Sequence, residues 1–169
     1  MRKEAEAWLK IADEEFQSAA HLFEKHLFRM VCYHAQQTVE KTLKAVLAEG
    51  EIEIPRTHNL LDLHAAARKL GYNPPLSDED AVFLTSIYRA RYPSGPGLLP
   101  SGEPTEQDAQ KSLQIAGKMN EWLKKMGERI KALWGKWNLV QKLIFFGIIA
   151  AVIVAIIIIF AVNAAPSVL

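Results

Sequence analysis

The sequence has few of the features that mark secreted, redox-active or strongly basic proteins. Its 169 residues contain one cysteine, Cys32, which cannot form an internal disulfide and, in an apolar helical pattern, is expected to be a buried thiol. Met1 to Lys10 is charged and no apolar run follows it, so no signal peptide is expected. The net charge is only +1, and residues 1–118 are net acidic, so this part is not expected to be a strongly basic nucleic-acid binder by bulk charge. Residues 1–118 also lack the alternating pattern of β-strands, so the expected fold class is all-α.

Charge is distributed unevenly along the chain. Residues 119–169 carry six basic and two acidic side chains, a net +4, whereas residues 1–118 carry 14 basic and 17 acidic side chains, a net −3. The length suits one domain of ordinary size plus an appendage. We expect a helical domain at 1–118, an amphipathic juxtamembrane segment at 119–142, a transmembrane helix at 143–162 and a short tail at 163–169.

Apolar residues recur at spacings of three and four through the first domain, which predicts amphipathic helices. Their bounds follow from Gly50 as a stop, from Thr57 and Ser77 as N-caps, and from Pro93, which disfavours helical geometry at the residue before it. About five helices are expected, over residues 3–25, 28–49, 58–70 and 77–91 and from 105 onward. The apolar stripe of the fifth continues to Trp137, either as one long helix running into the membrane or as a stretch lying on its surface.

The longest apolar run, Leu143 to Val162, has no charged residue. As a helix it would span about 30 Å, which is the thickness of the hydrocarbon core of a bilayer. The Lys and Arg residues of the C-terminal part all precede this run, so the positive-inside rule predicts a single-pass protein of the cell membrane with its N-terminal domain in the cytoplasm. The residues expected at the membrane interface are Trp134, Lys136, Trp137 and Lys142.

Three strings in the first domain carry a family resemblance. Residues 32–50 read CYHAQQTVEKTLKAVLAEG, residues 54–63 read IPRTHNLLDL and residues 87–95 read IYRARYPSG. In this order and separation they resemble the HEPN family, over about residues 1–118. The resemblance implies a helical bundle that pairs as a homodimer. Many such domains are encoded beside a minimal nucleotidyltransferase, in toxin–antitoxin-like pairs, and others are ribonucleases.

The ribonuclease branch of the family uses an Arg followed, four to six residues later, by a His. The Arg stabilises phosphoryl charge, and the His can move the proton of the 2′-hydroxyl. Arg89 and Arg91 stand in the corresponding neighbourhood, but no His follows within reach, and Ser94 occupies the fifth position after Arg89. We therefore assign no catalytic residue.

Binding is the better expectation for the remaining candidates. Arg89, Arg91 and Tyr92 could bind a phosphate or stack a base, although an Arg pair could equally close the C-terminal end of a helix. Arg56 and His58, from the second string, are further candidates for binding a nucleotide, RNA or a partner protein, with helix capping or packing as the alternative for His58.

Other polar residues are expected to be structural. Arg29 and His34 have the ribonuclease spacing in the wrong place, and residues five apart on a helix point about 140° apart. His64 is expected to be partly exposed, and Glu40 with Lys41 and Lys44 to form a solvated helix face. His21 and His26 lack further ligands at metal-like spacing, so neither a metal nor a cofactor is expected.

A second resemblance concerns the tail. Residues 119–169 resemble the N-terminus of the flagellar M-ring protein, up to its first membrane helix, so the chain could be a natural or constructed fusion. The leading hypothesis is a membrane-tethered HEPN-like binding module that is non-catalytic or degenerate, forms a homodimer, and pairs with a nucleotidyltransferase or binds a nucleotide or RNA. The alternatives are a membrane-anchored ribonuclease and a fragment of a flagellar basal-body anchor.

Overall fold

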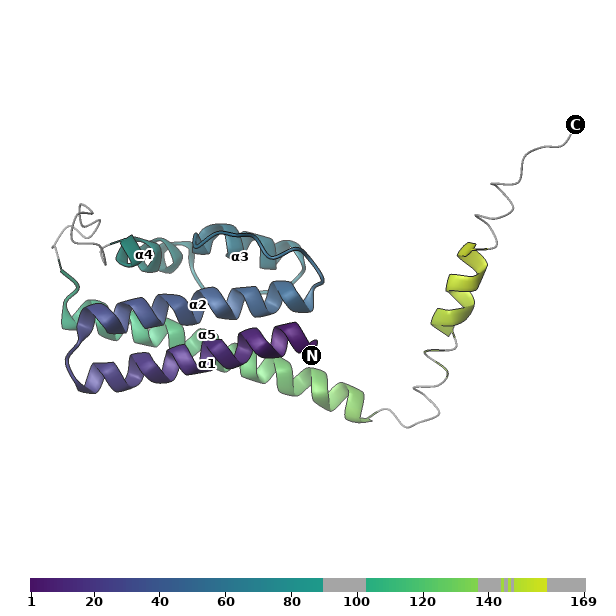
Figure 1. Cartoon of the computed structure of the whole chain (residues 1–169), viewed down its shortest axis with the longest axis horizontal. Coiled ribbons are helices and arrows are strands. Elements are labelled where there is room, and N and C mark those ends of the chain that lie inside the picture. Colours follow the sequence, from purple (N-terminus) through teal and green to yellow (C-terminus); the bar gives the residue numbers. More distant parts are fainter. Residues whose placement is uncertain (90–102, 137–143, 145, 147, 158–169) are drawn as a thin grey trace, which may run out of the picture. The chain divides into compact units, whose positions relative to one another are not determined.

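A computed structural model of the chain describes residues 1–89, 103–136, 144, 146 and 148–157 (Figure 1). Within the described ranges it contains five labelled helices, a further helical stretch at 148–157 and no strand, which confirms the all-α fold class. The helices are α1 (Lys3–Glu24), α2 (Phe28–Glu49), α3 (Leu60–Lys69), α4 (Asp78–Arg89) and α5 (Glu106–Lys136). The chain divides into two compact units, Met1–Glu128 and Arg129–Leu169.

Helix α2 is the centre of the first unit. It contacts α1 along one side and α3 and α4 along the other, so it lies between these elements in Figure 1. Ala5, Ala12 and Ala19 repeat every seven residues on α1 and are fully buried, which allows close approach of the two long helices. Because neighbours surround α2, its polar residues are buried together with its apolar ones.

The same hydrophobic core reaches into α5. Met119 and Leu123, which belong to the expected juxtamembrane segment, are fully buried among side chains of α2, α3 and α4. Asn120 donates to Asp13 of α1 over 3.0 Å, which ties α5 to α1 as well. The first unit therefore needs the first half of α5 to complete its core.

Local capping explains where the helices begin. Ser77 Oγ accepts from the backbone N–H of Asp80 over 3.1 Å, as expected for the N-cap of α4. The N-cap expected at Thr57 is wrong, because Asn59 caps α3 through its side chain and the helix begins at Leu60. Thr57 instead accepts from the N–H of Asn59 over 3.0 Å, which shapes the preceding loop.

The second unit holds a helical stretch at 148–157 in which every described residue is exposed. Within the described residues, no helix combines the length and the apolar character needed to cross a membrane. The expected span 143–162 lies partly outside these residues, since 143, 145, 147 and 158–162 are not among them. Trp134 and Lys136 lie in the last turn of α5, and Trp137 and Lys142 lie outside the described residues.

Candidate functional site

A fully buried carboxylate, that of Glu40, organises a polar cluster on α2. Its Oε1 atom accepts from Lys44 Nζ over 2.8 Å and from Lys41 Nζ over 3.2 Å. The side chains at positions 40 and 44 meet because residues four apart lie on one helix face. The sequence-based expectation of a solvated face is therefore wrong, because α2 is enclosed on both sides.

The other oxygen of Glu40, Oε2, faces the loop before α3 and two glutamines. His58 Nδ1 lies 3.0 Å from it, and Gln36 and Gln37 donate from 3.3 and 3.5 Å. An ionised carboxylate can only accept, so the proton of this contact belongs to His58 Nδ1. We refer to Gln36, Gln37, Glu40, Lys41, Lys44 and His58 as the Glu40 cluster.

These donors determine the charge state of Glu40. Burial opposes ionisation, but hydrogen bonds from Lys44 and His58 and the positive charges of Lys41 and Lys44 outweigh it, lowering the pKa of Glu40 from 4.5 to about 2. The carboxylate is consequently ionised at neutral pH and holds both ammonium groups on one oxygen.

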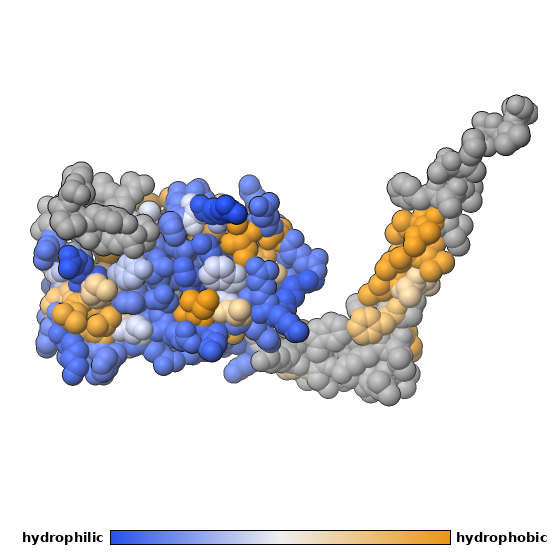
Figure 2. Space-filling model, in the orientation of Figure 1, coloured by the Kyte–Doolittle hydropathy of each residue, from blue (hydrophilic) through white to orange (hydrophobic). Residues whose placement is uncertain are grey.

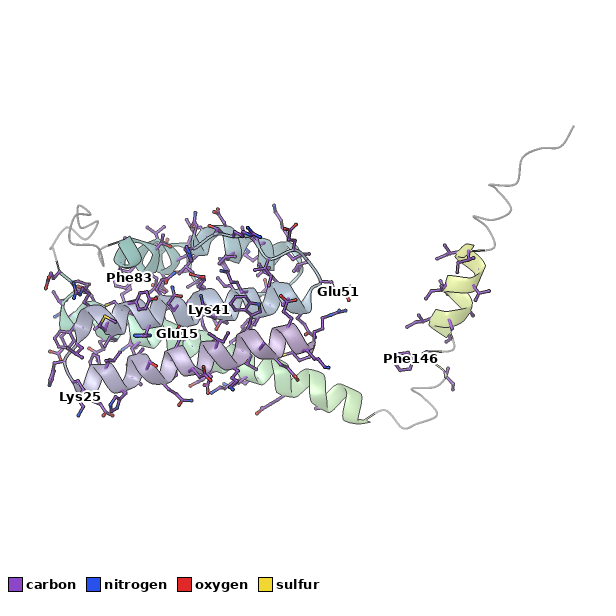
Figure 3. The ribbon with its side chains drawn as sticks, in the orientation of Figure 1. Glu15, Lys25, Lys41, Glu51, Phe83 and Phe146 are labelled. Atoms are coloured by element: carbon purple, nitrogen blue, oxygen red, sulfur yellow. The ribbon has the colours of Figure 1, made fainter. Side chains whose placement is uncertain are left out.

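An aromatic ring from α1 lines the cluster. The Nζ atoms of Lys41 and Lys44 lie 5.8 and 5.5 Å from the ring centroid of Trp8, within the range of cation–π contacts. The two lysine side chains are only 16% and 9% exposed, whereas that of His58 is 58% exposed. The cluster is therefore deep at its lysines and open at its histidine; Figure 3 labels Lys41 on α2.

The expected site residues are brought together only in part. His58 joins the Glu40 cluster, and Arg56, two residues earlier in the same loop, is exposed. Arg89 is the last residue of α4, and Arg91 and Tyr92 lie outside the described residues. The lysines of the cluster were not identified from the sequence as site residues. A signal for them was present, because a spacing of four separates Gln36, Glu40 and Lys44, which indicates a side-chain network along one helix face.

Two other histidines pair with carboxylates on another helix. His34 Nδ1 lies 2.6 Å from Glu15 of α1, which ties α1 to α2. His64 is 5% exposed and faces Asp78 of α4 at 3.6 Å, so the expectation that it is partly exposed is wrong. Its burial follows from its position on the face of α3 that meets α4. The part of the chain that the structure describes contains no group of three side chains suited to hold a metal ion.

Comparisons with known proteins agree with this architecture. No curated protein matches the chain. Two solved structures do, and each aligns with a TM-score of 0.54 over 98% of its own length. One is ST0689, described as an archaeal HEPN homologue, with 26% identity over 74% of this chain. The other is TT1696 from Thermus thermophilus, with 24% identity over 73% of this chain, a level that shows the fold alone.

The sequence model of the HEPN domain matches residues 5–126, which covers nearly all of the first unit, including α2, the loop with His58 and the first half of α5. The chain therefore belongs to the HEPN domain family.

Proposed function

We propose that this protein is a membrane-tethered HEPN binding module, held at the cytoplasmic face by residues 143–162 and recognising a nucleotide or RNA. It acts as a homodimer and pairs with a minimal nucleotidyltransferase. The observation that carries the tether is the exposed aliphatic surface of the second unit. Where the structure describes them, its large apolar side chains from Ile144 to Ile157 are 40–60% exposed.

An exposed surface of this kind is unfavourable in water. Large contiguous apolar patches on soluble domains are rare and indicate a contact with protein or lipid. Figure 2 colours the described residues of 144–157 as hydrophobic on the visible side, and the visible face of the first unit is mostly hydrophilic. Because the sequence from Leu143 to Val162 has the length and composition of a membrane span, a bilayer is the partner that suits this surface.

Binding is favoured over catalysis because the family's Arg…His pair is not intact after Arg89. The Glu40 cluster supplies cationic side chains of a different kind, with His58 at its exposed edge and Arg56 nearby in the loop. Cationic groups held in fixed positions favour phosphate-bearing ligands.

Membrane extraction tests the tether. The full chain should stay in the pellet after an alkaline carbonate wash, and a chain ending after Glu128 should be soluble. The shorter chain must retain Met119 and Leu123 because both are buried in the core. Release of the full chain into the supernatant would contradict the tether.

Ligand binding is tested separately. The full chain in a neutral detergent should bind nucleoside phosphates or short RNA in a calorimetric titration, more weakly as salt rises because the interaction is electrostatic. No heat of binding with any nucleotide or RNA at millimolar concentration would contradict this part of the proposal.

A further inference from the structure

The Glu40 cluster contains more buried positive charge than negative charge. Lys41 and Lys44 contribute two ammonium groups, and both contact the same oxygen of Glu40. Among the residues that the structure describes, Glu40 is the one carboxylate within 4.0 Å of either ammonium. A buried charge is costly unless an opposite charge compensates it. Within the described part of the chain, one positive charge of the cluster therefore lacks a matching carboxylate.

The cluster also has donors beyond those that Glu40 uses. Each ammonium carries three N–H groups, and Glu40 takes one from each lysine. In the contacts to Trp8 the ammonium groups lie over the face of the ring, which is not a conventional hydrogen-bond acceptor for the remaining N–H groups. An anion that approaches Lys41 and Lys44 could accept from both while Glu40 continues to hold them in position.

We propose that Lys41, Lys44 and His58 of the Glu40 cluster bind a terminal phosphate monoester, with Arg56 contacting the ligand from the exposed loop. This inference rests on the proposed function, because it takes the ligand from the nucleotide and RNA class and names the group that is recognised. That group is shared by a free nucleoside monophosphate and by an RNA with a phosphorylated end.

Burial argues for a terminal phosphate rather than a phosphodiester within a strand. The lysine side chains are 9% and 16% exposed, so a ligand reaches them only with a small end group. A monoester carries close to two negative charges at neutral pH and three oxygens that can accept hydrogen bonds. The surplus charge of the two lysines matches one of these negative charges and the guanidinium of Arg56 matches the other, whereas a diester carries only one negative charge.

Helix and loop geometry give each residue a distinct role. Glu40 is a positioning residue, since its two oxygens hold the lysines on one side and His58 on the other. Thr57 and Asn59 fix the loop on either side of His58 through the hydrogen bonds that start α3. The most exposed member, His58, lies on the solvent side of the cluster, where a ligand would enter.

The test compares ligands that differ only in the phosphate. The full chain in neutral detergent is titrated with adenosine and AMP, and with a short oligoadenylate that has either a 5′-hydroxyl or a 5′-phosphate. We expect AMP and the phosphorylated oligonucleotide to bind at least about tenfold more tightly than their unphosphorylated counterparts, because charge-assisted hydrogen bonds are gained. Equal affinities within each pair would overturn the proposal.

Variants then locate the site. Lys41→Met and Lys44→Met should each weaken binding of AMP by on the order of tenfold to a hundredfold. Lys10→Met is the matched control, because Lys10 is an exposed lysine of α1 whose one ion pair among the described residues is with Glu14, at 3.8 Å. Its AMP affinity should stay unchanged. Circular dichroism checks that each variant folds. If Lys44→Met does not fold, the AMP affinities of the more exposed Lys41→Met and of His58→Gln decide whether the site is correct.

The outcomes separate this inference from the proposed function. If AMP binds and the lysine variants bind it as tightly as the natural chain, the site is wrong while nucleotide binding stands. If RNA binds regardless of its 5′ end, recognition of a terminal phosphate is wrong. If nothing binds, both the site and the ligand class are wrong, and the tether is still judged by extraction.

Discussion

The buried carboxylate of Glu40 makes the stability of the first unit depend on pH in the acidic range. Its pKa falls from 4.5 to about 2 on folding, so its contribution is fully present above pH 4.5 and is lost as pH falls towards 2. A shift of this size corresponds to about 3 kcal/mol. Urea unfolding of the chain ending after Glu128, repeated from pH 7 to pH 2, should show a decline in the free energy of unfolding. The decline should be smaller in Glu40→Gln but should not vanish, because hydrogen bonds from Lys124 and Asn120 lower the pKa of Asp13 as well.

The same variant should already be less stable at neutral pH, also by about 3 kcal/mol, because removing one partner leaves Lys41 and Lys44 buried without their carboxylate. Glu53→Gln is the control, since Glu53 is exposed in the loop before α3. If Glu40→Gln and Glu53→Gln unfold at the same urea concentration at every pH, the cluster does not stabilise the fold.

The single thiol gives a second prediction at the residue scale. Cys32 is fully buried on α2, as its apolar pattern indicated, and burial raises its pKa from 9.0 to about 11. A neutral, enclosed thiol is a poor nucleophile. An aromatic disulfide reagent at pH 8 should therefore leave Cys32 unmodified in the folded protein and modify it fully in urea. Rapid reaction without urea would show that this end of the core opens readily.

At the scale of the elements, sequence patterns predicted the features that depend on neighbouring residues in the chain, such as where a helix begins and ends. The bounds of the second helix, Phe28 to Glu49, agree with those of α2, because the loop before it and Gly50 after it are local signals. The environment of Lys41 and Lys44 could not be predicted in the same way. A polar helix face is solvated or buried according to what packs on it, and the loop that carries His58 follows α2 and folds back onto it, which the sequence pattern of α2 does not show.

Helix α5 begins with a reciprocal cap that can be tested. Thr105 Oγ1 accepts from the N–H of Asp108 over 3.3 Å, and the Asp108 carboxylate accepts from the N–H of Thr105 over 2.8 Å. Thr105→Val keeps the side-chain shape and removes the hydroxyl. We expect a loss of about 1 kcal/mol in the free energy of unfolding. Gln107→Ala, at an exposed position of the same turn, should change it by less, and equal losses would contradict the cap.

At the scale of the whole molecule, the proposed homodimer leads to a prediction for the first unit. Ile11, Leu27, Met30 and Val82 are 39–53% exposed, although most large apolar side chains of this unit are in its core. Most oligomers of soluble proteins are symmetric homodimers. Light scattering of the chain ending after Glu128, at micromolar concentration, should give the mass of a dimer. A monomer mass across the accessible concentration range would count against the homodimer.

Catalysis is the property of the whole molecule on which the rival hypotheses differ most. A missing acid or base typically lowers a rate by on the order of a hundred- to ten-thousand-fold, and Ser94 stands where a His would follow Arg89. The purified protein should therefore leave structured RNA intact over hours. Cleavage that disappears in Arg89→Ala and Arg91→Ala would establish the ribonuclease instead. Cleavage that disappears in His34→Ala would assign the reaction to α2, where His34 lies 2.6 Å from Glu15, a carboxylate able to orient an imidazole base.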